Sequence, residues 1–352
     1  FRAIRPVASE PFRRQNGAMP ANLTPDYKKA EAAYKRSRDP KERLELLQEM
    51  HRTIPKHKGT EHLRADIKTK IKELKDELAG PSKGGARSGP PTFIHPDGAA
   101  QVAIVGPPNS GKSTLHAALT GSHTHIGVYP FTTQYPEPGM LSVEDTAIQL
   151  VDLPPISAQH PIPWIGNTLQ SADGALFVID LGQPGCVEQI VLAREILADR
   201  RVTLSGTWDR AAGDGDDPFA IRLPTLLVAN KADAIPDIEG DLDVCRELGD
   251  LHFPTIIVSA ETGEGLDTIG PWLFRNLDIV RVYTKVPGKE PDMDRPYTVR
   301  HGATVEDISR MVHRDLAASF HHARIWGRGS YDGQQVGKEH IVEDGDILEI
   351  HA

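Results

Sequence analysis

The stretch GPPNSGKST at residues 106–114 has the residue types and the spacing of a phosphate-binding loop. It follows the apolar run QVAIV and precedes a helical pattern, which is the context that such a loop needs. Glycine at 106 and 111 lets the backbone approach an anion without a Cβ clash, so the loop amides can face the phosphates. We expect Lys112 to reach the β- and γ-phosphates and Ser113 to bind Mg²⁺. The predicted phosphate contacts are Gly106, Pro107, Pro108, Asn109, Ser110, Gly111, Lys112, Ser113 and Thr114.

Two further motifs specify the base of the bound nucleotide. NKAD at 230–233 ends one apolar run, and SAETG at 259–263 ends the next. The Asp233 carboxylate can accept two hydrogen bonds from the N1–H and 2-amino groups of guanine, a pattern that adenine lacks. A site built around such an acceptor rejects the wrong base, because a mismatch leaves the acceptor unpaired. The predicted base contacts, which include an amide near Ala260 for guanine O6, are Asn230, Lys231, Asp233, Ser259, Ala260 and Glu261.

Short apolar runs alternate with helical patterns from residue 101 onward, and these must position both motifs. Continuous Val, Ile and Leu runs, each followed by a loop and a helix, are typical of buried strands in a parallel sheet. We therefore expect an α/β fold, a doubly wound and mostly parallel sheet of the P-loop NTPase type, over residues 99–278. The runs are QVAIVG, AIQLVD, GALFVID, LPTLLVAN and PTIIVSA.

Segments of different composition flank this sheet. Residues 25–79 have the Lys, Glu, Leu and Ala content and the apolar spacing of helices, so we expect a helical hairpin. Residues 80–98 read as a Gly/Pro/Ser linker, and residues 1–24 as a disordered leader, with a transit peptide as the alternative. Residues 279–352 predict a small α+β domain in which one helix, over 304–320, lies on a mixed sheet.

Charge is unevenly distributed along the chain, whose formal net charge is −9. Residues 26–77 hold 15 Lys and Arg against 11 Asp and Glu, so this arm carries about +4. A basic arm on an acidic body favours contact with RNA or another polyanion, and it equally fits a solvated helical surface. The two cysteines and the lack of a long apolar run indicate a reduced, cytoplasmic protein without a membrane span.

Taken together, these motifs resemble the Obg/developmentally regulated GTP-binding (DRG) family of GTPases. YPFTT at 129–133 resembles the family's switch I, and residues 54–78 resemble its N-terminal arm. The closing segment, from RVYTKVPGKEPD to HIVEDGDILEI, is similar to a TGS domain. The resemblance implies a Ras-like G domain followed by a β-grasp TGS domain, with GTP or GDP and Mg²⁺ bound. It also implies the ribosome or rRNA as partner, through the arm and the TGS-like domain, with a protein cofactor as a further candidate.

The resemblance also implies roles for residues beyond the loop amides. Thr133, with Thr132 as the alternative, would supply the switch I contact to Mg²⁺ and the γ-phosphate, and Asp152 would hold Mg²⁺ through water. Asn109 resembles the residue that binds K⁺ in potassium-activated relatives, and its alternative role is to brace the loop. The implied metal ligands are Ser113, Thr133 and Asp152, and the implied catalytic residues are Asn109, Lys112, Thr133 and Asp152.

Pro155, in VDLPPISAQH, departs from the family pattern Asp-x-Pro-Gly, whose glycine amide contacts the γ-phosphate. Proline has no N–H, so a charge-assisted hydrogen bond of about 1.5–3 kcal/mol is lost. Two interpretations remain open. The first is a slow GTPase that switches mainly through switch I, which the intact Lys112, Ser113, Thr133 and Asp152 favour. The second is a nucleotide-binding module or RNA-binding adaptor with little turnover.

Overall fold

The computed structural model describes residues 23–37, 39–78, 93–122, 135–208, 217–329 and 331–352. Contacts divide the chain into two compact units, residues 1–88 and residues 89–352. Both candidate switch I threonines, Thr132 and Thr133, lie outside the described residues, as do most of the predicted leader and linker. Among the helices of the described ranges, none has the length and apolarity that a membrane crossing requires.

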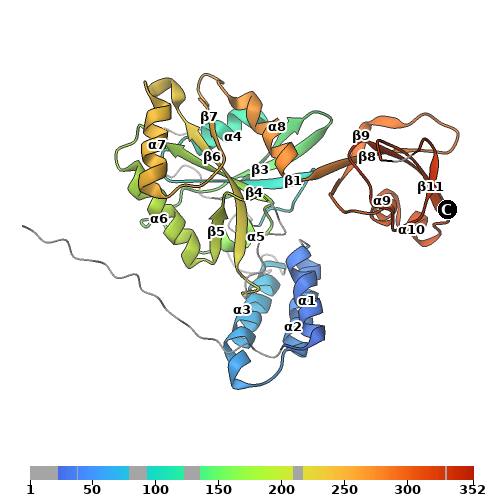
Figure 1. Ribbon diagram of the computed structural model, residues 1–352. Helices are drawn as coiled ribbons and strands as arrows, with labels where there is room; N and C mark the ends of the chain where they lie inside the picture. The colour runs from blue at the N-terminus through green and yellow to red at the C-terminus, as the bar shows by residue number, and fades with distance from the viewer. Residues whose placement is uncertain (1–22, 38, 79–92, 123–134, 209–216, 330) are drawn as a thin grey trace, which may run out of the picture. The chain divides into compact units, whose positions relative to one another are not determined.

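The described residues of the first unit form three α-helices and a short 3₁₀ turn, so a third helix joins the predicted hairpin (Figure 1). α2 packs against both other helices. Side chains from all three helices make the small core: Tyr27, Ala30, Tyr34, Leu47, Met50 and Ile67. The elements are α1 (Pro25–Arg36), α2 (Pro40–Thr53), η1 (Lys58–Thr60) and α3 (Glu61–Leu78).

Local sequence explains where the first two helices begin. Each has proline at its first position, where the missing N–H costs no intrahelical hydrogen bond. The residue before it caps the helix: the Thr24 hydroxyl accepts from the Tyr27 amide at 3.2 Å, and the Asp39 carboxylate accepts from the Lys41 amide at 3.1 Å. The helix starts are therefore determined by contiguous residues.

Seven strands of the described residues form the first sheet of the second unit, in the order β2–β3–β1–β4–β6–β5, with β7 also paired to β6. The pairings are parallel except that of β2 with β3. The five predicted apolar runs form β1, β3, β4, β6 and β7, and the predicted fold class is confirmed. The strands are β1 (Ala100–Val105), β2 (Glu137–Val143), β3 (Thr146–Asp152), β4 (Gly174–Asp180), β5 (Val202–Ser205), β6 (Ile221–Asn230) and β7 (Thr255–Ile257).

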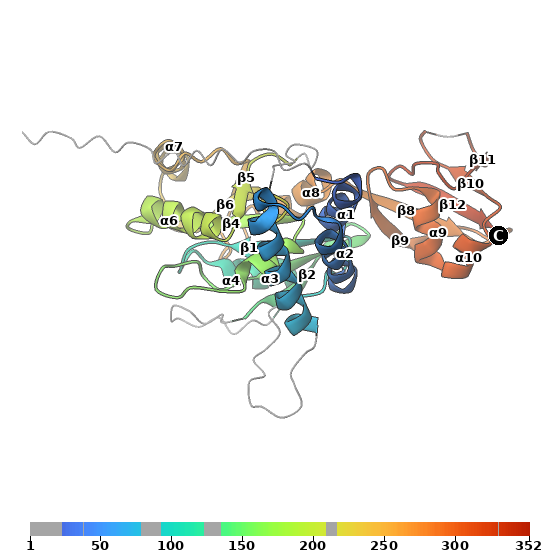
Figure 2. The ribbon, with the colours of Figure 1, turned by 90° about the horizontal axis from the view of Figure 1, so that it is seen from below.

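Helices cover both faces of this sheet (Figures 1 and 2). Buried side chains of α5, α6 and α7 join the core on one face, and those of α4 and α8 join the core on the other. Because the central strands are parallel, their carboxyl ends lie at one edge, where ligands bind in open α/β sheets. The helices are α4 (Lys112–Thr120), α5 (Ile165–Gln170), α6 (Cys186–Asp199), η2 (Ala232–Ala234), α7 (Ile238–Gly249) and α8 (Leu266–Asn276).

The C-terminal module, residues 279–352, is a five-stranded mixed sheet in the order β11–β10–β12–β8–β9. β12 and β8 are parallel, and the other pairs are antiparallel. α9 packs on one face through Val305 and Ile308. The elements are β8 (Ile279–Lys285), β9 (Asp292–Arg300), α9 (Val305–Val312), α10 (Arg314–Ala318), β10 (His322–Trp326), β11 (Gln334–Val336) and β12 (Asp346–His351).

The single helix predicted over 304–320 is wrong, because the helix is interrupted at His313. This residue is extended, with φ −164° and ψ 137°, and its imidazole Nδ1 accepts from the Asp315 amide at 3.2 Å. That cap starts α10, a short second helix. The apolar spacing continues across the break, so the periodicity alone could not reveal it.

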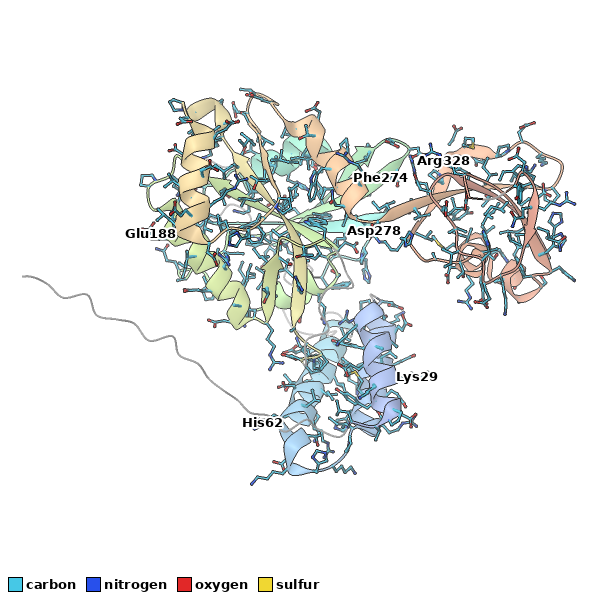
Figure 3. The ribbon with its side chains drawn as sticks, in the orientation of Figure 1. Lys29, His62, Glu188, Phe274, Asp278 and Arg328 are labelled. Atoms are coloured by element: carbon cyan, nitrogen blue, oxygen red, sulfur yellow. The ribbon has the colours of Figure 1, made fainter. Side chains whose placement is uncertain are left out.

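Two arginines of the C-terminal module contact the first sheet of the same unit. Arg300 lies 2.9 Å from the Asp173 carboxylate, which is buried and also accepts from the Gln101 amide at 2.9 Å. Arg281 lies 2.9 Å from Asp145, and its guanidinium stacks 4.8 Å from the centre of the ring of Phe274 (Figure 3). Only the Arg300 contact reaches the start of β1, the strand that leads into the phosphate loop, since Gln101 lies in that strand.

Candidate functional site

The predicted phosphate loop connects the end of β1 to the first turn of α4. Gly106 has φ 154°, and a Cβ built there would lie 2.3 Å from the Val178 carbonyl oxygen. Gly111 has φ 87°, and a Cβ there would lie 2.3 Å from the Asn230 side-chain nitrogen. Glycine is therefore favoured at both positions, where the loop lies close to β4 and to the end of β6. Pro108 and Thr114 are half-buried in the same stretch.

Lys112 is buried at the start of α4, and its ammonium donates to the Pro107 carbonyl at 2.8 Å. Ser110 donates to the same carbonyl at 3.1 Å. Burial lowers the pKa of Lys112 to about 8, although the nearby Asp152 carboxylate opposes this shift. A phosphate placed in the loop would favour the charged form, so binding of the anion and protonation of Lys112 are coupled.

Ser113 and Asp152 provide a pair of oxygen atoms beside this loop that could bind a metal ion. Register pairing of β3 with β1 sets Asp152 opposite Ile104, and the Ser113 hydroxyl donates to its carboxylate at 2.6 Å. Hydroxyl and carboxylate oxygens are the ligands that Mg²⁺ prefers, usually together with phosphate oxygens and water. The pair therefore fits a magnesium ion. The predicted third ligand, Thr133, lies outside the described residues.

Backbone hydrogen bonds connect the segment after Asp152 to β1 and to the phosphate loop. The Leu153 amide donates to the Ile104 carbonyl at 3.2 Å, and the Ile156 amide donates to the Gly106 carbonyl at 3.0 Å. Between them, Pro154 and Pro155 have no N–H. All four residues from 153 to 156 are buried. Across this segment, the two prolines have no backbone N–H, and the other two N–H groups are already bonded to carbonyls.

Asn230, at the end of β6, connects the phosphate loop to the 259–263 loop. Its side-chain nitrogen donates to the Ser110 carbonyl at 3.0 Å, and its side-chain oxygen accepts from the Ala260 amide at 3.0 Å. The Ala260 N–H is thus engaged, so a donor to guanine O6 would be a neighbouring amide of that loop. Glu261, also predicted to contact the base, is exposed there.

Ser259 orients the carboxylate predicted to recognise guanine. Its hydroxyl donates to Asp233 at 2.5 Å and accepts from the Thr262 amide at 3.1 Å. Asp233 itself is exposed at the carboxyl edge of the sheet. An exposed carboxylate held by a buried hydroxyl is positioned to accept the paired donors of a guanine ring.

Known proteins resemble this chain in sequence over most of its length. Residues 101–204 match the family model described as 50S ribosome-binding GTPase, and residues 280–352 match that of the TGS domain. An uncharacterized GTP-binding protein of Methanocaldococcus jannaschii is 28% identical, over 88% of this chain and 92% of the relative. Developmentally-regulated G-protein 1 of Arabidopsis thaliana is 28% identical, over 87% and 89% of the two chains. The chain is a homologue of the developmentally regulated GTP-binding proteins.

Among solved structures, a variant of Aquifex aeolicus Era is 22% identical to this DRG homologue, with a TM-score of 0.38. The alignment covers 64% of this chain and 71% of the Era chain. The recognition of a DRG-type GTPase with a TGS domain is confirmed by the two family matches and the relatives.

Sequence reasoning missed one charged residue of the DRG-type site. Asp180 ends β4 and lies 2.8 Å from the ammonium of Lys231, which also donates to the Asn109 carbonyl at 2.9 Å. A polar residue at the carboxyl end of the run GALFVID was the available signal. Asn109 has φ 61°, a left-handed conformation that asparagine tolerates, which gives this residue type a role in the loop turn.

Proposed function

We propose that this chain is a guanine-nucleotide switch protein that slowly hydrolyses GTP to GDP and phosphate with Mg²⁺. The observation that carries the proposal is the meeting of three groups at one sheet edge. These are the buried Lys112, the Ser113–Asp152 oxygen pair and the Ser259-oriented Asp233. Lys112 would stabilise charge on the transferred phosphoryl group, and a Mg²⁺ ion held by Ser113 and Asp152 would supply further positive charge there.

The fixed segment after Asp152 supports a slow rate. In a GTPase, an amide there normally meets the γ-phosphate, and here residues 153–156 have no N–H left to give. The difference between the GTP and GDP states would then rest on switch I. The same observation favours a second candidate function, a nucleotide-binding module with little or no turnover.

Potassium stimulation is a further element of the proposal. Asn109 would contribute its exposed side chain to a K⁺ ion, which would supply positive charge beside the phosphates. The left-handed backbone of this residue offers an independent reason for asparagine, so the comparison of K⁺ with Na⁺ decides between the two roles. A stimulating monovalent cation would act electrostatically, as an arginine finger does.

The proposed partner is ribosomal RNA or the ribosome, contacted through the helical arm and the TGS domain in the cytoplasm. The family description quoted above, a GTPase that binds the 50S subunit, supports this partner. Basic side chains lie close together on the arm. The pKa of His51 is lowered, first by burial and then by repulsion from Arg64, Lys68 and Lys56. A phosphate backbone would relieve that repulsion, and its binding would weaken steeply with salt.

One experiment tests the proposal: GTP turnover by the purified chain in K⁺ and in Na⁺, with and without ribosomes. We expect slow phosphate release above the enzyme-free blank, faster with K⁺ and with ribosomes. Lys112→Met should abolish it, whereas the exposed Lys289→Met should leave the rate without ribosomes unchanged. Turnover at the blank under every condition, with GTP still bound, would favour the binding module instead.

A further inference from the structure

The C-terminal module holds the turn of the hairpin that β2 and β3 form. Glu144 and Asp145 are the two residues between these strands, and Arg281 of β8 forms ion pairs with both carboxylates, that with Asp145 at 2.9 Å. The hydroxyl of Tyr283, two positions further along β8, also donates to Asp145. Two side chains of one strand therefore converge on one turn of the nucleotide-binding sheet.

Contacts within the module and with α8 hold Arg281 in place. The Asp344 carboxylate accepts from its guanidinium at 2.8 and 3.0 Å and from its backbone amide at 2.8 Å. The ring of Phe274, labelled in Figure 3, lies 4.8 Å from the guanidinium carbon. Burial, and then the hydrogen bond to Asp145, raises the pKa of Tyr283 to about 12, so its hydroxyl remains a donor. With 17% of the Arg281 side chain exposed, this arginine differs from a solvated surface ion pair.

The hairpin connects this turn to the nucleotide site. β2 and β3 pair through seven successive residue pairs, from Val143 with Thr146 beside the turn to Glu137 with Asp152 at the far end. Asp152 belongs to the oxygen pair that fits Mg²⁺. Because the register contains no slip, a displacement at one end of the hairpin is passed along both strands to the other end.

The helix that follows the phosphate loop also contacts the hairpin. His116, one turn after Lys112 in α4, is buried against Gly139 of β2, where an added Cβ would lie 2.6 Å from its Nε2. Among the described strands, β2 pairs with β3 alone, so it is an edge strand that shifts at a small cost in broken hydrogen bonds. β2 begins four positions after Thr133, the predicted switch I residue. The hairpin is therefore the part of the sheet that adjoins both the nucleotide site and the C-terminal module.

We propose that Arg281 and Tyr283 are positioning residues of the nucleotide switch, which link the C-terminal module to the guanine-nucleotide site through the β2–β3 hairpin. This inference rests on the proposed function, since it requires that the chain binds both GTP and GDP. A nucleotide that shifts the hairpin also shifts β8. By the same coupling, a partner that binds the module and changes these contacts changes the GTP:GDP affinity ratio. Arg300 holds the module at another place, the start of β1, and is not part of this link.

Hydrogen exchange of the full chain, with GDP and with a non-hydrolysable GTP analogue, tests the transmission. We expect the exchange of residues 137–146 and of β8 to differ between the two nucleotides. In the double variant Arg281→Ala, Tyr283→Phe, the difference should remain in the hairpin and disappear from β8. A merely structural contact would instead change the exchange of β8 equally with both nucleotides. Arg300→Ala is the matched control, because it removes the other arginine contact between the module and the sheet, and it should preserve both differences.

Titration calorimetry with the same two nucleotides tests the reciprocal effect. The ratio of their affinities should change about fivefold or more in the double variant, and it should stay at the parent value in Arg300→Ala. Tyr283→Phe alone retains the arginine ion pairs and removes one hydroxyl, so it should remain folded and change the ratio by a smaller factor. This single variant keeps the measurement possible if the double variant does not fold.

Three results would overturn the link. The exchange of β8 in the parent could be identical with both nucleotides, the affinity ratio could be unchanged in the folded variants, or Arg300→Ala could change that ratio as much as the double variant does. Each of these would leave the proposed function intact, because the parent would still bind both nucleotides. A parent that binds neither nucleotide would remove the proposed function itself, and the coupling with it.

Discussion

Replacing Pro155 by glycine should restore a donor to a segment that has none to offer. The flanking amides of Leu153 and Ile156 are bonded to carbonyls of β1 and the phosphate loop, so position 155 is where a new N–H would be unengaged. A hydrogen bond to a charged acceptor contributes about 1.5–3 kcal/mol. The added freedom of glycine offsets roughly 0.5–1 kcal/mol of this. The remainder, roughly 0.5–2.5 kcal/mol, is centred near 1.4 kcal/mol and would raise the GTP:GDP affinity ratio on the order of tenfold.

Titration calorimetry of the nucleotide-free chain with GDP and with a non-hydrolysable GTP analogue, both with Mg²⁺, measures this ratio. Pro161→Gly is the matched control, because it makes the same chemical change at an exposed position further along the same segment. We expect the ratio to change in the first variant and not in the control. A folded Pro155→Gly protein whose ratio equals that of the parent would refute the reasoning, since the new amide would then make no contact with the γ-phosphate.

Three other perturbations test separate parts of the site and the fold. At pH 8, GDP binding should take up about half a proton, because the phosphates restore the charge on Lys112, whose pKa is about 8 without them. Calorimetry in two buffers of different ionisation enthalpy measures this proton uptake. Asp233→Asn should weaken GDP binding at least tenfold and favour xanthosine diphosphate, since an amide donates where a carboxylate accepts; a competition assay measures the exchange of preference. Arg300→Ala should lower the free energy of unfolding by about 1–3 kcal/mol, because the buried Asp173 carboxylate loses its counter-ion. The exposed Arg310→Ala should change it by less than about 0.5 kcal/mol in the same urea titration.

Each of these expectations has an outcome that contradicts it. Absence of proton uptake at pH 8 would mean that Lys112 is already charged before the nucleotide arrives. Unaltered guanine preference in Asp233→Asn would mean that this carboxylate does not face the base. Equal losses of stability for Arg300→Ala and Arg310→Ala would mean that the Asp173 contact contributes no more than a surface ion pair.

Much of the fold was predictable because its signals are local. Apolar runs such as GALFVID predicted buried strands, and the caps at Thr24 and Asp39, each followed by proline, show that the first two helix starts are also encoded locally. The break at His313 was not predictable, since the apolar spacing continues through it and a single side-chain cap interrupts the helix. Periodicity reports which face is buried, and it does not report where one helix ends and the next begins.

The sequence by itself determined the kinds of chemistry available at the site. A glycine-rich loop, the lysine directly after its last glycine and the aspartate of an Asn-Lys-x-Asp motif each carry their function in contiguous residues. It also revealed that Pro155 has no N–H. Only the tertiary structure decided which donors meet which acceptors. The contact of Asn230 with two loops, the pairing of Lys231 with Asp180 and the bonding of the Ile156 amide to Gly106 all depend on strand order and register. These are long-range pairings, because hydrogen bonds form between groups that the fold brings within about 3 Å, whatever their separation along the chain.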